Sequence, residues 1–98
     1  MSKKVTLIGM LGEGKFATVD NSDYKDVSKY EWRRLVVHKG NMQIDLEMAK
    51  YYDPRDHRVN SLKDGEYAYR IVNEKIQLLQ YYIAWKATGK SGFIEFSN

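Results

Sequence analysis

The apolar positions near the N-terminus predict an opening β-hairpin. Residues 5–10 and 15–19 are two short runs rich in apolar and β-branched residues. Between them lies Gly12-Glu13-Gly14, whose two glycines supply the backbone angles that a tight reversal requires. Two such runs separated by a glycine-containing turn are typical of paired antiparallel strands.

The next segment predicts a short helix that begins near Ser22 and ends near Tyr30. Ser22 is a good N-cap, and Asp26, one turn later, suits the positive end of a helix. Tyr24, Val27 and Tyr30 follow at intervals of three and give this helix one apolar edge.

Residues 33–48 predict a second hairpin, with Gly40-Asn41 or Lys39-Gly40 as its two-residue turn. Residues 42–48 alternate apolar and polar side chains, which is the period of a half-buried strand. A helix capped by Asn41 remains an alternative, because several of these residues also form helices well. With Gly40-Asn41 as the turn, the strand pairing places Val37 opposite Ile44, Leu35 opposite Leu46 and Arg34 opposite Glu47.

The C-terminal half predicts a polar loop, a long helix and a final strand. Residues 51–65 contain Pro54 and many charged side chains, which favour an exposed loop. Residues 66–87 place their polar side chains on one side of a helix, and residues 93–96 read as a short strand. The expected fold is one small α+β domain, an antiparallel sheet of hairpins in the order β-β-α-β-β-loop-α-β.

Composition narrows the class of protein. The chain has 98 residues and no cysteine, so disulfides and cysteine-bound zinc are excluded, and we expect a cytoplasmic protein. No run approaches the roughly 20 apolar residues of a membrane helix, so no membrane partner is expected. The net charge of +3 leans towards anionic partners, and eight tyrosines and two tryptophans suit an interface.

Three local patterns resemble catalytic or metal sites but lack their partners. Residues 12–19 resemble the glycine-rich loop of protein kinases, yet no kinase metal-binding or base residues follow. The remaining two patterns are an acidic-and-lysine set, Asp45, Glu47 and Lys50, and a loop cluster, Asp53, Asp56 and His57. Neither has the spacing or the convergent ligands of a nuclease or metal site. We therefore expect no catalytic residue, no metal and no cofactor.

One stretch near the N-terminus carries a family resemblance. Its residues are Gly14, Lys15, Ala17, Val19, Asp20, Asp23, Tyr24 and Trp32. In this pattern the chain resembles small phage and mobile-element DNA-binding modules that are associated with HNH homing endonucleases and related to the plant ethylene-response domain. The match covers about 20 residues. The family's Met-His-Arg segment and the HNH triad are absent here, so the resemblance implies DNA binding without nuclease activity.

The first functional hypothesis is therefore a non-catalytic protein that binds double-stranded DNA through a basic β-hairpin. The resemblance implies recognition by a three-stranded sheet, and basic side chains on a sheet contact phosphates and base edges. The candidate residues lie on or beside the central hairpin, with two lysines in support: Arg33, Arg34, His38, Lys39, Lys15 and Lys29.

The second hypothesis is a protein-interaction module, such as a phage-encoded inhibitor of a host enzyme or defence system. Aromatic anchors carry much of the binding energy of protein interfaces. The candidate anchors lie on the predicted long helix: Tyr81, Tyr82, Trp85 and Lys86. A homodimer built on the same helix is a variant of this hypothesis. A third alternative is a small-ligand or nucleotide site that uses aromatic rings with Arg55, Arg58 or Lys63.

Overall fold

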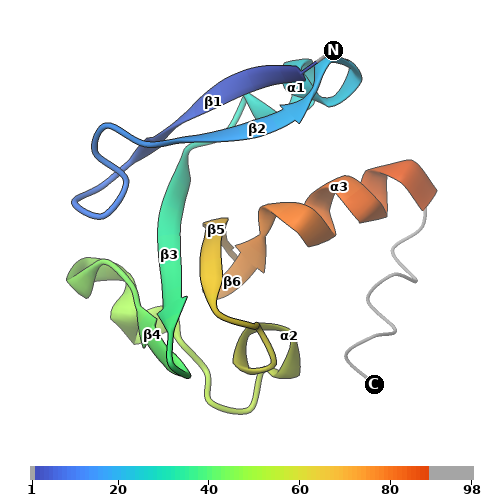
Figure 1. Cartoon of the computed structure of the whole chain (residues 1–98). Coiled ribbons are helices and arrows are strands. Elements are labelled where there is room, and N and C mark those ends of the chain that lie inside the picture. The colour runs from blue at the N-terminus through green and yellow to red at the C-terminus, as the bar shows by residue number, and fades with distance from the viewer. Residues whose placement is uncertain (1, 89–98) are drawn as a thin grey trace.

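The computed structural model describes residues 2–88 and begins with the predicted hairpin (Figure 1). Strand β1 (Ser2–Ile8) pairs antiparallel with β2 (Phe16–Asp20). The connecting loop closes with a hydrogen bond of 3.0 Å from the Leu7 N–H to the Lys15 carbonyl. Gly14 has φ +74°, a conformation that glycine adopts without strain. The opening hairpin is confirmed.

Helix α1 (Asn21–Val27) follows β2 directly and is shorter than predicted. Its N-cap is Asp20 rather than Ser22, and the helix ends at Val27 rather than near Tyr30. Val27 is fully buried, and its carbonyl accepts the Trp32 indole N–H at 2.8 Å. This bond holds the end of α1 against the start of β3 (Trp32–His38).

Strand β3 runs through the middle of the sheet. It pairs in parallel with the end of β1, at Leu7 and Ile8, and antiparallel with two later strands. The sheet is therefore mixed rather than wholly antiparallel as expected. Its strand order is β2-β1-β3-β5-β6, and β4 pairs with the end of β3.

The predicted strand over residues 42–48 is wrong beyond its first two residues. Strand β4 covers Asn41–Gln43, and a 3-10 helix, η1, covers Leu46–Tyr51. The turn is Lys39-Gly40, with φ values of 51° and 78°, so Val37 lies opposite Met42 instead of Ile44. The Leu35–Leu46 and Arg34–Glu47 pairs are not formed either. The chain leaves the sheet because Asp45, on the expected polar face, turns inward and is buried.

The predicted helix over residues 66–87 is also wrong in its first half. Residues Gly65–Val72 form β5, Lys75–Leu78 form β6, and only Leu79–Thr88 form a helix, α3. Asn73 and Glu74 make the turn between the strands, with φ values of 51° and 62°. In β5, Tyr67, Tyr69 and Ile71 share one face, which fits strand packing better than a helix surface.

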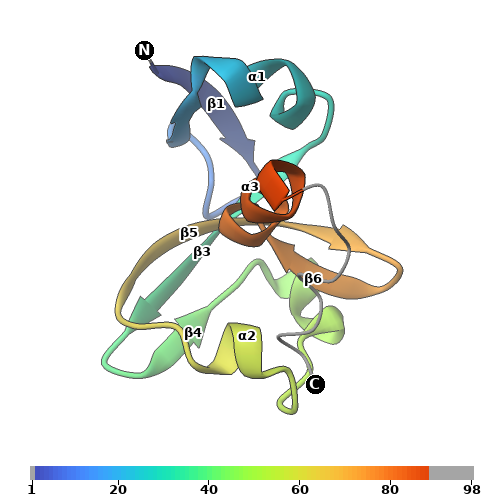
Figure 2. The same ribbon diagram turned by 90° about the vertical axis from the view of Figure 1, so that its right-hand side faces the viewer.

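Both faces of the sheet are covered, and each has its own small core (Figure 2). Helix α3 lies over the face that carries Trp32 and Ala68, where Tyr82 packs with α1 and the opening hairpin. The segment from β4 through helix α2 (His57–Asn60) covers the opposite face, over Leu35 and Tyr69. The α+β class is confirmed, and the strand predicted at residues 93–96 lies outside the described residues.

Candidate functional site

The two arginines predicted to contact DNA are held by carboxylates of the protein itself. The Arg33 Nη1 atom lies 3.0 Å from Asp45 Oδ2 and 3.0 Å from Glu47 Oε1. The Arg34 Nε atom lies 2.9 Å from Glu66 Oε1, and its Nη1 donates to the Leu11 carbonyl at 3.1 Å. Hydrogen bonding and the positive charge of Arg34 lower the pKa of Glu66. Less than a fifth of either arginine side chain is exposed.

The other four predicted DNA contacts do not share one surface element. His38 and Lys39 are exposed at the β3–β4 turn, where the Lys39 backbone N–H donates to Asp64 at 2.8 Å. Lys15 lies at the end of the β1–β2 loop. Lys29, just beyond α1, lies 3.4 Å from Asp26.

Asp45 is a buried carboxylate that joins the β1–β2 loop to β3 through hydrogen bonds. Its side chain is only 2% exposed, and it receives two donors from distant parts of the chain. Arg33 supplies one, and the Leu11 backbone N–H supplies the other at 2.9 Å from Oδ1. A buried carboxylate is stable only when it is paired and hydrogen-bonded in this way. Asp45 therefore fixes the β1–β2 loop against the start of η1.

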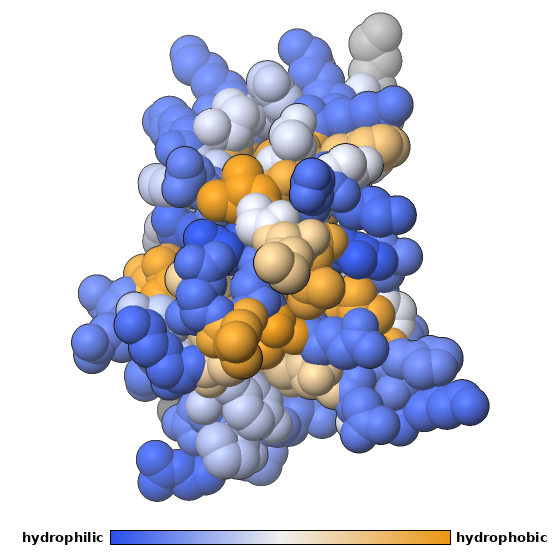
Figure 3. All heavy atoms as spheres, turned by 90° about the vertical axis from the view of Figure 1, so that its left-hand side faces the viewer, coloured by the Kyte–Doolittle hydropathy of each residue, from blue (hydrophilic) through white to orange (hydrophobic). Residues whose placement is uncertain are grey.

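Two large apolar side chains flank this polar contact and point into solvent. Met10, next to Leu11, is 86% exposed, and Leu46, next to Asp45, is 91% exposed. We call these two residues the Met10–Leu46 tip. They are the most exposed of the large hydrophobic residues in the described chain. Apolar side chains gather on the face of the molecule that carries the β1–β2 loop (Figure 3).

A shallow hollow adjoins the tip. It is lined by the end of β1, the loop that follows and one residue of η1, and its only charged lining residues among those described are Glu13 and Glu47. Glu47 is 64% exposed despite its bond to Arg33. The tip is therefore an apolar surface with an acidic edge.

The residues predicted as anchors on α3 divide between the core and the surface. Tyr82 is 7% exposed and packs against Trp32, with ring centroids 5.8 Å apart. Lys86 lies 3.3 Å from Asp23 and 2.7 Å from Asp26, so it ties α3 to α1. Trp85 is 40% exposed, and Tyr81 is partly buried against the core that contains Leu35 and Tyr69.

Within residues 2–88, no three His, Asp or Glu side chains come together to hold a metal ion. Burial, with the negative charge of Asp45 nearby, raises the pKa of the Tyr69 hydroxyl, which favours its neutral form. No described helix is long and apolar enough to cross a membrane.

Comparisons with protein-family models, with curated proteins and with solved structures found no match to this chain. The chemistry of the site itself therefore carries the functional inference.

The Met10–Leu46 tip was not among the residues predicted from the sequence. The sequence pattern predicts Met10 at the end of a strand and Leu46 opposite Leu35 in another. One signal was present: Met10 and Leu11 stand between Gly9 and Gly12, so apolar residues occupy a turn. The Met10 side chain has no sheet face on which to be buried there, and it becomes a surface feature.

Proposed function

We propose that this chain is a non-catalytic protein-interaction module that binds a partner protein through the Met10–Leu46 tip. The observation that carries the proposal is the exposure of these two side chains, whose sequence neighbours Leu11 and Asp45 are joined by a hydrogen bond. Isolated apolar residues on a surface are ordinary, but two large apolar side chains on hydrogen-bonded neighbouring segments, one of them lining a hollow, are a feature of binding surfaces. Preorganisation lowers the entropy lost on association.

The side chains of the tip indicate which kind of surface the partner presents. Methionine and leucine side chains fill an apolar pocket, and methionine adapts its shape to the pocket wall. Glu13 and Glu47 at the edge favour a basic rim on the partner, since complementary charges guide association. A phage-encoded inhibitor of a host enzyme or defence system would use such a surface, and its cytoplasmic location stays a prediction.

The test compares variants for capture and affinity. The tagged chain and its Met10→Ser/Leu46→Ser variant are used to capture proteins from a host extract, and the captured protein is then purified and titrated against both. We expect the double variant to bind at least about tenfold more weakly, because interface anchors of this kind contribute more than about 1 kcal/mol.

Trp85→Ser is the matched control, because it also removes an exposed apolar side chain but lies on α3. We expect it to bind like the unaltered chain. If Trp85→Ser loses affinity and the tip variant does not, the interface belongs to α3. If neither variant loses affinity, the proposed surface is wrong.

A second candidate function is DNA binding. Its support is the resemblance near the N-terminus together with exposed basic side chains outside the sheet faces, since both faces of the sheet are covered. His38, Lys39 and Lys15 are exposed and available to phosphates, whereas Arg33 and Arg34 would first have to leave their carboxylates.

Duplex DNA titrated at low and moderate salt tests this candidate. Phosphate contacts release counterions, so binding should weaken steeply as salt rises, and Lys39→Ala should weaken it further. The absence of binding at low salt would exclude DNA. Light scattering on the same sample tests the homodimer, whose mass would be twice that of the 11.5 kDa chain.

A further inference from the structure

A cleft of about 430 Å³ lies on a different part of the surface from the Met10–Leu46 tip. One wall is the segment from Lys50 to Arg58, and the other is the turn between β5 and β6, at Glu74, Lys75 and Ile76. Pockets of this volume accommodate small organic ligands. Two tyrosines, Tyr51 and Tyr52, are among the lining residues.

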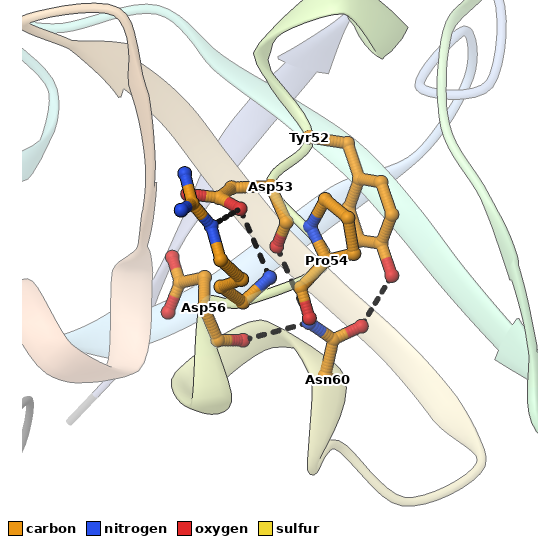
Figure 4. Close-up of polar contacts among 6 residues, drawn as sticks. Tyr52, Asp53, Pro54, Asp56 and Asn60 are labelled. Carbon is orange, nitrogen blue, oxygen red and sulfur yellow. Dashed lines mark hydrogen bonds and ion pairs between the residues drawn. The ribbon is translucent and has the colours of Figure 1, made fainter.

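The long wall of this cleft is a fixed loop, although it has little regular secondary structure (Figure 4). The Asn60 amide nitrogen donates to the carbonyls of Asp53, Pro54 and Asp56 at 3.2, 2.7 and 3.0 Å. The Asn60 side-chain oxygen accepts the Tyr52 hydroxyl. A single side chain therefore satisfies several loop carbonyls at once, and the loop can present its outer side chains in a set arrangement.

Two of the three acidic residues that line the cleft, Asp53 and Asp56, are already engaged by the loop. Asp53 Oδ1 accepts the Arg55 backbone N–H at 2.9 Å, and this bond is the main cause that lowers the pKa of Asp53. Asp56 Oδ1 accepts the Arg58 backbone N–H at 3.1 Å and caps α2, and it also lies 3.6 Å from Arg58 Nε. These carboxylates serve as turn and cap acceptors, so they have fewer free lone pairs to offer a ligand.

Two basic residues of the cleft, Lys50 and Lys75, are more available, whereas Arg58 pairs with Asp56. Four lysine and arginine side chains and His57 line it: Lys50, Arg55, Arg58 and Lys75. Arg55 is 91% exposed, and its contact with Asp53 spans 3.4 Å. Within residues 2–88, no carboxylate lies within ion-pair distance of the amines of Lys50 or Lys75, and the Lys50 amine stands 5.2 Å from the centre of the Tyr51 ring.

We propose that this cleft binds a phosphate ester of nucleotide size. The phosphate lies between Lys50 and Lys75, which approach it from the two walls, with Arg55 adding a guanidinium from the rim. Ammonium and guanidinium groups form charge-assisted hydrogen bonds with phosphate oxygens, and these are among the stronger polar contacts. The organic part of the ester lies along the tyrosine side of the cleft, since aromatic rings stack with planar bases.

The test uses the full chain in calorimetric titrations with ADP, with inorganic phosphate and with adenosine. ADP should bind most tightly, inorganic phosphate more weakly, and adenosine weakest of all, because it lacks the charge. Lys50→Gln/Lys75→Gln should weaken ADP binding at least about tenfold, since it removes two charge-assisted contacts.

Lys39→Gln/Lys63→Gln is the matched control, because it removes the same charge from two exposed lysines that do not line the cleft. We expect it to leave ADP binding unchanged. An equal loss in both double variants would mean diffuse attraction to a basic surface and would overturn the proposal. So would equal binding of ADP and adenosine, equal binding of ADP and inorganic phosphate, or no binding of ADP at millimolar concentration.

A structural readout separates this site from a failure to fold. Chemical shifts of the Asn60 side-chain amide and of Tyr52 report on the loop in the absence of ligand. These chemical shifts should be the same in the Lys50→Gln/Lys75→Gln variant as in the unaltered chain, because Lys50 and Lys75 are exposed. The Met10→Ser/Leu46→Ser variant should bind ADP normally, so the two proposals can fail independently.

Discussion

The Asp45 carboxylate accepts the backbone N–H of Leu11 across 34 residues of sequence, at 2.9 Å. The same carboxylate pairs with Arg33 on β3, so a loop, a central strand and η1 meet at one buried group. This arrangement explains why the chain leaves the sheet after β4. It also explains why Met10 and Leu46, on either side of the contact, are exposed.

The first prediction compares the two carboxylate partners of Arg33, of which Asp45 is buried and Glu47 is exposed. Asp45→Ala should lower the free energy of unfolding by about 2–4 kcal/mol, because it leaves Arg33 and the Leu11 N–H without their shared acceptor. Glu47→Gln removes the other, 64% exposed partner of Arg33 and should cost less than about 1 kcal/mol. Urea unfolding measures both values. Equal losses would show that Asp45 is not the centre of the network.

Gly9 offers a second test of the same contact. It has φ +85°, and a Cβ atom added there would lie 2.1 Å from Asp45 Oδ2 and 2.8 Å from Arg33 Nη1. Gly9→Ala should therefore displace the ion pair as well as strain the backbone, and should cost more than about 2 kcal/mol.

Gly14 is the control for this substitution. It has φ +74° in the same loop, but no atom lies within 4 Å of an added Cβ. Gly14→Ala should show the backbone strain alone, roughly 1–2 kcal/mol. Thermal and urea unfolding of the two variants give the comparison, and a Gly14→Ala cost that matches or exceeds that of Gly9→Ala would contradict it.

The sequence predicted those elements whose signals are local. The opening hairpin and α1 follow from glycines, capping residues and short apolar runs that lie within a few positions of one another. The β5–β6 hairpin was missed because its turn, Asn73-Glu74, contains no glycine, and because its strands depend on pairing with β3. Long-range pairing overrides the helix preference of individual residues.

For the candidate sites too, local features could be predicted from the sequence and contacts between distant elements could not. The sequence identified Arg33 and Arg34 as basic positions on a strand, and both lie there. It paired Arg34 with Glu47, but β5 brings Glu66 to Arg34, and η1 brings Glu47 to Arg33. Partners that come from other elements cannot be assigned without the topology, and those partners decide whether an arginine is free to bind a ligand.

The third prediction concerns acid stability. Asp64 accepts the backbone N–H groups of Lys39 and Gly40, and these bonds lower its pKa. An aspartate in an unfolded chain titrates near pH ~3.9. Because the folded pKa is lower, the bonds stabilise the fold fully above that pH, and this contribution is lost as the pH falls through the folded pKa.

Asp64→Asn should therefore be less stable than the unaltered chain at pH 7, and the difference should shrink towards zero as the pH falls to about 2. Urea midpoints of both proteins at the two pH values measure this change. A difference that is the same at both values would mean that the carboxylate charge is not involved.

The last prediction separates core from surface on α3. Tyr82 is 7% exposed and contacts Tyr30, Trp32 and Trp85 through its ring. Tyr82→Ala should therefore cost about 3–5 kcal/mol, as expected when a large buried aromatic side chain is removed. Trp85, on the same helix, is 40% exposed, and Trp85→Ala should cost less, about 1–2 kcal/mol, because only part of its ring is buried against Tyr82. Both values come from urea unfolding followed by circular dichroism, which does not depend on the tryptophan removed. A small loss for Tyr82→Ala would return this ring to the list of available interface anchors. A large one assigns it to the core, and any loss of partner binding by that variant would then reflect unfolding rather than a lost contact.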